Sequence, residues 1–409
     1  MAELDPREGP EFFLNIPAKL DNPYADFAYF RRHRPVFYYE PMNTWFIFRY
    51  EDVERLFMDP RLSSKRMDAF IEGAPADMRE EIRGFTRIFD RWVLMLDGPE
   101  HSRLRKLLHR GFSPRVVATF QEMITELANE LLDRVQGHGA MDAAADFAHP
   151  LPVMVICGLL GVPRGERDRV MHWADSIADF FNDLPITARN TQRFKGSSAE
   201  MITSVRGLIA ARRAEPKGDF LSELVQAQED GQGLTEEEIL ANCIVLLIAG
   251  HETTRNLIGN AVYLLLTHPE QLTRLRRDPS LYRNAIEETL RFESVHPMMP
   301  RIAAEDFALH GQQIRKGQFV YLCMGSSNRD PDHFPDPDVY DITKQPDKHL
   351  AFGIGPHFCL GAPLARQEAQ IALQTLLTRM PNLKLDERRP PQWQRIANLR
   401  GPRSLPVVF

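Results

Sequence analysis

The sequence lacks the marks of several protein classes. It has no apolar run long enough to span a bilayer, and its first residues, Met1 to Pro6, are acidic rather than signal-like. We therefore expect a cytoplasmic protein without a membrane anchor. A net charge of −6 gives no reason to expect nucleic acid as a partner. No linker, repeat or low-complexity tract interrupts the 409 residues, so we expect one domain over residues 1–409, and a monomer.

Cysteine is also scarce, and the four cysteines form no metal-binding spacing. Cys157 and Cys243 stand in apolar helical text and Cys323 in a strand-like run, which favours core thiols. Cys359 differs, because it stands in the run Phe-Gly-Ile-Gly-Pro-His-Phe-Cys-Leu-Gly at residues 352–361. This run is the most informative part of the sequence.

The residues around Cys359 suit a thiolate ligand to haem iron. Gly353, Gly355 and Gly361 have no Cβ, so the backbone can take positive φ and approach a flat macrocycle closely. The run at 362–368 predicts the first turns of a helix, with Pro363 near its start. A thiolate just before a helix is stabilised by the helix dipole. The alternative is a buried structural thiol beside an ordinary glycine turn, but three glycines and His357 in register favour the ligand.

Helical patterning dominates beyond about residue 100, with apolar residues at three- and four-residue spacing. Earlier, the segments 36–40 and 44–49 flank a Pro-Met-Asn turn and predict a hairpin. Further strand signals lie at 318–323 and 405–409. The sequence therefore predicts a mainly α (α+β) fold with small sheet regions.

The clearest helix runs from Thr235 to about Thr267, with capping-box spacing between Thr235 and Glu238. Residues 244–249 are apolar all round, so we expect them to be buried. The text Ala-Gly-His-Glu-Thr-Thr follows at 249–254. Glycine in a helix costs about 1 kcal/mol relative to alanine, and a buried unpaired carboxylate costs more. A bond from Thr253 to the Ala249 carbonyl would bend the helix, so these residues indicate a groove that holds a proton-bearing pair. The alternative is a helix kink with a solvated glutamate.

The cysteine run and this helix together resemble the ligand loop and the oxygen-activating motif of the cytochrome P-450 superfamily, soluble bacterial type. The resemblance extends over nearly the whole chain. It implies the cytochrome P-450 fold, with haem b between the long central helix and the cysteine-loop helix. Cys359 would ligate the iron, and further contacts to the haem would come from Ala249, Gly250, Phe352, Gly353, His357 and Gly361.

The resemblance also assigns the catalytic pair. Glu252 would relay protons from solvent, and Thr253 would hydrogen-bond the iron-bound dioxygen so that water rather than peroxide leaves. The neighbouring His251 could suggest a zinc-hydrolase helix, but that motif needs a second histidine where Arg255 stands. We expect His251 to point away from the haem into a polar contact.

Other residues match supporting positions of the family. Glu288 and Arg291 match its Glu-x-x-Arg core motif. The usual basic third member is Val339 here, so Arg329 or a backbone carbonyl could close the network instead. The positions that commonly bind haem propionates are His101, Arg105, Arg301 and His357.

The resemblance implies a monooxygenase that inserts one atom of O2 into a hydrophobic small molecule, by hydroxylation or epoxidation, in secondary-metabolite tailoring. Candidate pocket residues are Val245, Ile248, Ala249, Met298, Met299 and Ile396. The segment 61–94 and the residues Phe180, Phe181 and Leu184 would add to the pocket. Arginines 66, 79, 83, 87 and 91 leave room for an acidic group on the substrate.

Electrons must come from separate proteins, because the chain has no reductase domain. A ferredoxin or flavodoxin with an NAD(P)H-dependent reductase would dock on a basic cluster formed by Arg103, Arg105, Lys106, His109, Arg110 and Arg115. Two alternatives stay open: a peroxide-dependent haem-thiolate oxidase, and a haem-based sensor or carrier. Neither would need the Glu252–Thr253 pair.

Overall fold

The computed structural model describes residues 11–182, 187–229, 234–345 and 348–409. Its contacts divide the chain into two compact units, each made of separate stretches. Unit 1 comprises residues 1–63, 259–359 and 384–406, and unit 2 comprises residues 64–258, 360–383 and 407–409. The single-domain expectation stays a prediction.

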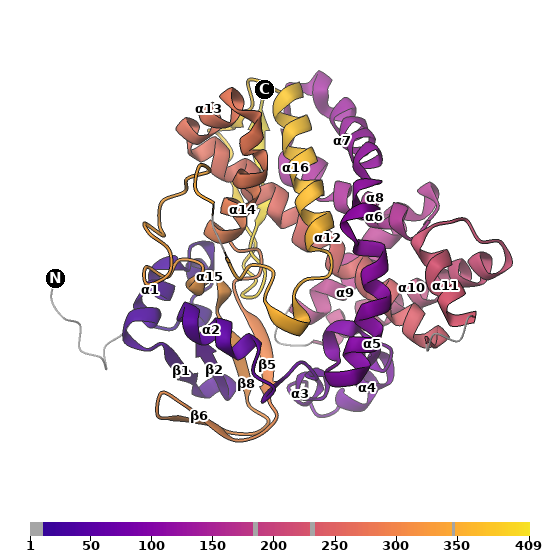
Figure 1. Cartoon of the computed structure of the whole chain (residues 1–409), viewed down its shortest axis with the longest axis vertical. Helices are drawn as coiled ribbons and strands as arrows, with labels where there is room; N and C mark the ends of the chain where they lie inside the picture. The colour runs from indigo at the N-terminus through magenta and orange to yellow at the C-terminus, as the bar shows by residue number, and fades with distance from the viewer. Residues whose placement is uncertain (1–10, 183–186, 230–233, 346–347) are drawn as a thin grey trace. The chain divides into compact units, whose positions relative to one another are not determined.

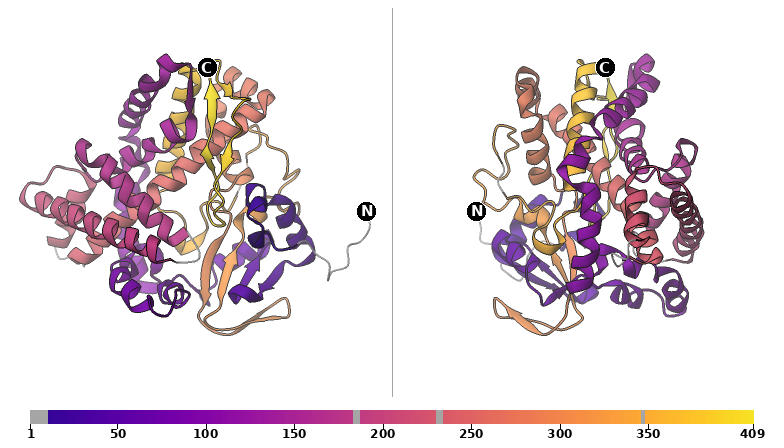
Figure 2. Two further views of the ribbon diagram at one scale, coloured as in Figure 1. Left: turned by 180° about the vertical axis from the view of Figure 1, so that it is seen from behind. Right: turned by 45° about the vertical axis from the view of Figure 1, so that its right-hand side comes forward.

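Unit 1 contains a mixed sheet with strand order β1-β2-β8-β5-β3 (Figure 1). The hairpin prediction is confirmed: β1 (Val36–Tyr39) and β2 (Thr44–Ile47) pair antiparallel, with Asn43 in a left-handed conformation before β2. β8 (Phe319–Leu322) runs parallel to β2 and antiparallel to β5 (Met299–Ala303), and β3 (Leu62–Ser63) closes the edge. The strands lie side by side when seen from behind as well (Figure 2).

Alternating residues of these strands serve two hydrophobic cores, as the two-residue period of a strand requires. Trp45, Ile47, Val320 and Leu322 belong to one core, together with Leu56 and Phe57 of α2. Phe46 belongs to the other core. There the Phe12 ring lies 5.3 Å from Phe30 and 4.8 Å from Phe46. The sheet is therefore buried on both faces.

The remaining elements of unit 1 are short helices and strands. They are α1 (Tyr24–His33), α2 (Tyr50–Phe57), α13 (Pro269–Arg277), α14 (Tyr282–Phe292), α15 (Met324–Ser327), β6 (Phe307–Leu309), β7 (Gln312–Ile314), β9 (Lys384–Leu385), β10 (Gln392–Trp393) and β11 (Pro402–Ser404). A last strand, β12 (Pro406–Val408), crosses the boundary between the units, and it lies where the sequence predicts one.

Unit 2 is almost entirely helical. Its elements are α3 (Met67–Glu72), α4 (Arg79–Thr86), α5 (Gly98–Leu108), α6 (Pro114–Ala118), α7 (Gln121–Val135), β4 (Ala140–Asp142), α8 (Pro150–Leu159), α9 (Arg167–Asn182), α10 (Ala188–Ala214), α11 (Phe220–Glu229) and α16 (Ala362–Arg379). A π-helical turn (Ala143–Ala148) precedes α8.

Two pairs of helices in unit 2 pack together through apolar residues at helical spacing. α7 and α16 lie side by side (Figures 1 and 2), and each buries apolar residues at three- and four-residue spacing, such as Ile124 and Leu127 on α7 and Leu373 and Leu376 on α16. α9 and α10 also pack together, with the rings of Phe180 and Phe194 stacked 4.1 Å apart. Leu184 lies outside the described residues.

The long helix α12 (Glu236–Thr267) has 32 residues and continues from unit 2 into unit 1. The predicted capping box is confirmed, because the Glu238 N–H donates to Thr235 Oγ1 (3.2 Å) and the Thr235 N–H donates to Glu238 Oε2 (2.9 Å). In the described part of the chain, no helix combines the length and apolar character needed to cross a membrane.

Candidate functional site

The cysteine loop belongs to unit 1 up to Cys359. A hydrogen bond from the Cys359 N–H to the Phe352 carbonyl (2.9 Å) closes the loop. Gly353 (φ +66°) and Gly355 (φ +75°) take positive φ, as predicted. Gly361 does not use the positive φ that a glycine allows: it has φ −82° and is the N-cap of α16, whose first residues include Pro363. Gly361 therefore ends the turn without left-handed backbone. Its contact with haem stays a prediction.

All four cysteines are described, and Cys359 is the one that is not fully buried. Burial raises the pKa of Cys157 and of Cys243 to about 12, and it raises the pKa of Cys323 as well. These three thiols stay protonated and lie in cores, as expected. The half-buried position of Cys359 in a glycine turn fits the thiolate ligand of a haem.

A second group of candidate residues lies on α12, in unit 2. Ile244, Val245 and Leu247 are buried as predicted, but Ala249 is exposed and Ile248 half-buried. The expectation that residues 244–249 are buried all round was therefore wrong. Exposure of small apolar residues on one face fits a flat, apolar ligand against that face. A Cβ on Gly250 would make an ordinary van der Waals contact with the Ile156 side chain of α8 at 3.5 Å, so packing between the two helices leaves room for a methyl group there.

The acid and the alcohol of α12 have distinct environments. Thr253 Oγ1 donates to the Ala249 carbonyl at 2.8 Å, as predicted. Glu252 is half-buried, and burial raises the pKa of its carboxyl group, against the opposing charges of His251 and Arg255. A carboxyl group with a raised pKa can hold and release a proton nearer to neutral pH than an exposed one.

His251 makes the polar contact that its sequence position indicates. It is fully buried, and its ring nitrogens lie 3.2 Å from the Leu247 carbonyl and 3.0 Å from Asp175 Oδ1. His149 Nε2 lies 3.1 Å from the same Asp175 oxygen. The sequence analysis missed Asp175 and His149, because they lie 76 and 102 positions before His251 and no local motif marks them.

The propionate candidates divide between the units. In unit 2, His101 is buried and Arg105 half-buried on α5, one helical turn apart. In unit 1, Arg301 is buried on β5, where its guanidinium lies 5.5 Å from the centre of the Phe57 ring and donates to the Pro300 carbonyl. His357 is half-buried in the turn before Cys359. Cationic and imidazole donors of this kind suit the two carboxylates of a haem.

The Glu288–Arg291 pair is the best-defined support in unit 1. Both side chains are buried, and the guanidinium binds the carboxylate through two bonds of 2.7 Å. Arg291 also donates to the carbonyls of Asn328 (3.0 Å), Pro337 (2.8 Å) and Val339 (3.2 Å). Backbone carbonyls therefore complete the Glu288–Arg291 network, as one of the two predicted alternatives had it. Arg329 instead donates to the Phe292 carbonyl.

The predicted pocket residues have different surroundings. Val245 is buried on α12, and Met299 is half-buried on β5. Met298 is buried in the second core of unit 1, as an ordinary core residue is. Ile396 is half-buried and lines a small cavity together with Phe13, Phe27 and Pro297. The pocket assignment stays a prediction for all six residues.

Comparisons with known proteins agree with this picture. The cytochrome P450 family profile matches residues 9–394. The biotin biosynthesis cytochrome P450 of Bacillus subtilis is 38% identical over 396 residues, which cover 95% of this chain and 97% of the relative. The mycinamicin IV hydroxylase/epoxidase of Micromonospora griseorubida is 40% identical over 90% of each chain.

A solved structure gives the same answer for the fold. The crystal structure of P450BioI in complex with hexadec-9Z-enoic acid ligated acyl carrier protein has a TM-score of 0.88 and 37% sequence identity, and the match covers 96% of this chain and 99% of that one. By sequence and by fold, this chain belongs to the cytochrome P450 family of haem-thiolate monooxygenases, and its cofactor is haem b.

Proposed function

We propose that this chain oxidises a hydrophobic small molecule, by hydroxylation or epoxidation, in cytoplasmic secondary-metabolite tailoring. Cys359 is the proposed iron ligand. The observation that carries this assignment is its half-buried place in a glycine turn, while the other three cysteines are buried thiols. Bound haem would supply dioxygen binding and, through the thiolate, electron density that favours O–O cleavage.

The chain's own residues would then manage protons. Glu252 is the proposed relay, since its half-buried carboxyl group has a raised pKa. The hydroxyl hydrogen of Thr253 is donated to the Ala249 carbonyl. The hydroxyl oxygen therefore remains free to accept a hydrogen bond, and it can do so from a protonated ligand bound beside the exposed Ala249. This pair favours a monooxygenase over a peroxide-dependent oxidase and over a haem-based sensor or carrier.

The substrate class is hydrophobic, because the described candidates Val245, Ile248 and Met299 are apolar. The names of two similar proteins give precedents: one is in complex with an acyl carrier protein that carries hexadec-9Z-enoic acid, and the other is a mycinamicin IV hydroxylase/epoxidase. An acidic group on the substrate is less well supported than the sequence indicates. Arg66 donates to the Ser64 carbonyl, Arg79 to the Ala74 carbonyl and Arg83 to Asp68, so the protein itself already engages these three side chains.

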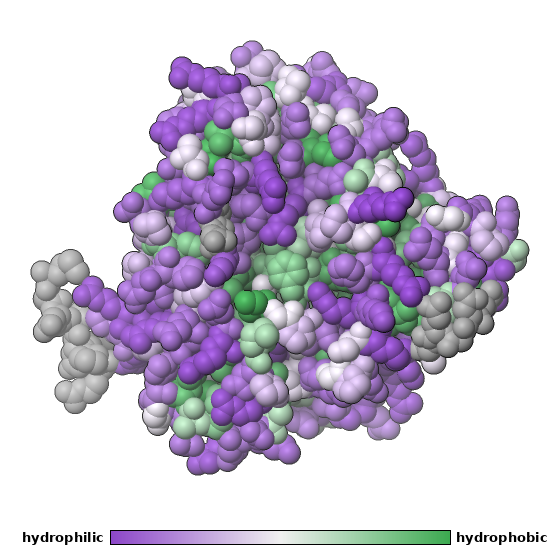
Figure 3. Space-filling view, in the orientation of Figure 1, coloured by the Kyte–Doolittle hydropathy of each residue, from purple (hydrophilic) through white to green (hydrophobic). Residues whose placement is uncertain are grey.

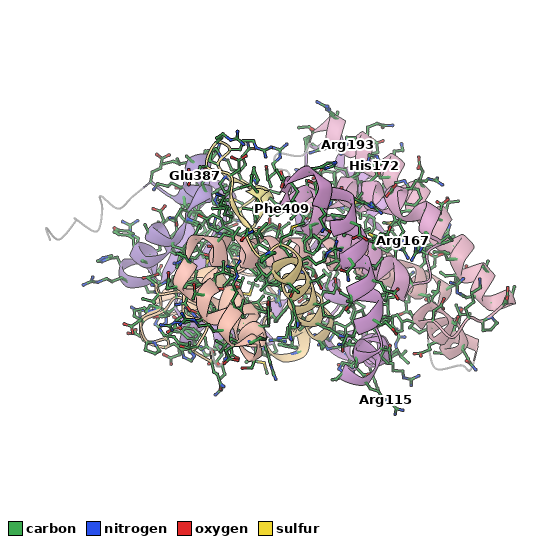
Figure 4. The ribbon with its side chains drawn as sticks, turned by 90° about the horizontal axis from the view of Figure 1, so that it is seen from above. Arg115, Arg167, His172, Arg193, Glu387 and Phe409 are labelled. Carbon is green, nitrogen blue, oxygen red and sulfur yellow. The ribbon has the colours of Figure 1, made fainter. Side chains whose placement is uncertain are left out.

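Bacterial enzymes of this family generally take electrons from ferredoxins, and we propose that the donor docks on the basic cluster of unit 2. Arg103 pairs with Glu238, which removes much of its charge from that surface. Lys106, His109 and Arg110 are exposed, and Arg115 points away from the ribbon at α6 (Figure 4). These four positions are the proposed contacts for a ferredoxin or flavodoxin served by an NAD(P)H-dependent reductase.

Labelled oxygen tests this function directly. The purified holoenzyme is first titrated with macrolides, steroids and fatty acids, and the compound with the largest spin-state shift of the haem is turned over with ferredoxin, reductase and NADPH. One atom from ¹⁸O₂ should enter the product, and none from H₂¹⁸O. Turnover with added hydrogen peroxide alone, at a rate above that of the NADPH system, would instead support the peroxide-dependent enzyme.

A further inference from the structure

His251 lies within α12 and has a hydrogen-bond acceptor beside each ring nitrogen. One ring nitrogen faces the Leu247 carbonyl at 3.2 Å and the other faces Asp175 Oδ1 at 3.0 Å. Both partners are hydrogen-bond acceptors, and a neutral imidazole has only one N–H to donate. Both bonds can therefore form only if the ring is protonated.

Asp175 supplies the negative charge that would stabilise a protonated His251 ring. It stands on α9, the helix that also carries Arg167 and His172 (Figure 4), and its side chain is 34% exposed, whereas that of His251 is fully buried. Burial alone would lower the pKa of His251, but the hydrogen bond to Asp175, the charges of Glu252 and Asp175 and the bond to the Leu247 carbonyl together raise it. Burial would raise the pKa of Asp175, but hydrogen bonds from His149 and His251 outweigh that effect and hold it below its usual range.

The same carboxylate oxygen joins a third element. His149 stands directly before α8, and its Nε2 lies 3.1 Å from Asp175 Oδ1. Its side chain is 19% exposed. One oxygen thus links α12, α9 and the start of α8, and the polar cluster extends from buried His251 to partly exposed His149 and Asp175.

The charge of His251 lies next to the proposed proton relay. Burial raises the pKa of Glu252, and the positive charges of His251 and Arg255 oppose that rise, while Asp175 and Asp179 add to it. The charge of His251 has a larger effect on the pKa of Glu252 than the charge of Asp175 has. Loss of the His251 charge would therefore make the Glu252 proton harder to release, even when Asp175 is neutralised at the same time.

We propose that His251, held as an imidazolium by Asp175, is a positioning residue that fixes α12 against α9 and keeps the neighbouring Glu252 able to exchange its proton. This role rests on the proposed function of Glu252. The role of His251 differs from that of the Glu252–Thr253 pair, because neither His251 nor Asp175 needs to touch the substrate, the haem or the reacting atoms.

Histidine-selective ¹⁵N NMR of the diamagnetic reduced carbon monoxide complex tests the charge independently of turnover. In the wild-type holoenzyme at pH 7, the resonances that disappear in His251→Gln should show both ring nitrogens protonated. Asp175→Asn should convert His251 to a neutral ring, and His149→Gln, the matched control on the same oxygen, should not. A neutral His251 ring in the wild-type protein would overturn the proposal. If no variant folds, a wild-type spectrum in which no histidine has both ring nitrogens protonated would overturn it as well.

Turnover then tests the consequence. Asp175→Asn should raise, several-fold, the fraction of NADPH electrons released as hydrogen peroxide, while His149→Gln stays near wild type. Peroxide release equal in Asp175→Asn and wild type would reject the role in proton transfer. A melting temperature that rises with added zinc and falls with chelator, and that loses this response in His149→Gln, would also overturn the proposal, since the cluster would then be a metal site.

Discussion

At the scale of one residue, Thr253 combines a backbone hydrogen bond with a proposed chemical role. Its hydroxyl donates to the Ala249 carbonyl, one turn back on α12. Thr253→Ala should keep NADPH consumption but divert electrons to peroxide, because the hydroxyl proposed to hydrogen-bond the bound oxygen would be lost. Product and peroxide per NADPH consumed give the measurement.

Thr267 supplies the matched control for that change. It is the last residue of the same helix and donates to the Tyr263 carbonyl at 2.9 Å, the same kind of bond. Thr267→Ala should leave the product yield per NADPH unchanged. If Thr253→Ala were as well coupled as Thr267→Ala, Thr253 would have no role in proton delivery.

The buried imidazolium makes a prediction about pH. The folded-state pKa of His251 is raised, so its contribution to the free energy of unfolding is fully present below its unfolded value of about 6.5 and is lost as the pH rises through the folded value. The wild-type protein should therefore lose stability over that rise, relative to Asp175→Asn. Denaturant unfolding at several pH values measures the difference, and two parallel pH profiles would contradict a charged His251.

Individual residues were also where sequence reasoning was weakest. Glu252, Thr253 and Cys359 could be proposed as site residues because each stands in a short local motif. Asp175 and His149 could not, since their only relation to His251 is spatial. The exposure of Ala249 depends on tertiary packing, so residue type alone predicted it wrongly.

At the scale of elements, Arg291 connects α14 to the segment 328–341. It makes a buried two-bond pair with Glu288 and donates to three backbone carbonyls, of Asn328, Pro337 and Val339. Arg291→Lys keeps the charge but cannot satisfy these acceptors together. We expect it to lower the free energy of unfolding by about 1–3 kcal/mol, because buried acceptors lose their donors.

An exposed pair provides the contrast. Arg134 and Glu130 lie four residues apart on α7 with 60% and 40% of their side chains exposed. Arg134→Lys should change the free energy of unfolding by less than about 0.5 kcal/mol. Urea denaturation of both variants compares them, and equal small effects would mean that Arg291 does not hold the segment.

Helices and strands could be predicted well where a local sequence signal sets their position. The hairpin, α12 with its capping box and the start of α16 follow from turn residues, caps and a proline, which act within a few positions. The order β1-β2-β8-β5-β3 could not be predicted, because it pairs strands that lie more than 250 positions apart along the chain.

At the scale of the whole molecule, we expect the distribution of surface charge to guide docking of the proposed ferredoxin. Hydrophilic side chains cover most of the face in Figure 3. The basic cluster therefore differs from the rest of the surface in its positive charge, not in being polar. Reversing the charge of Arg110 or Arg115 to glutamate should raise the KM for ferredoxin several-fold, and the effect should shrink at high salt.

Arg277→Glu on α13 serves as the control, since it changes the net charge equally at an exposed position outside the cluster. Its KM for ferredoxin should match wild type. Equal increases for Arg277→Glu and Arg110→Glu would show a general charge effect and no defined docking surface.

The central claim is that Cys359 ligates the haem iron, and the reduced carbon monoxide complex tests it most directly. Thiolate ligation should give the strongly red-shifted haem band. The band should disappear in Cys359→His and persist in Cys323→Ser, which alters a buried thiol. A wild-type band typical of histidine ligation, or an unchanged red-shifted band in Cys359→His, would contradict the assignment.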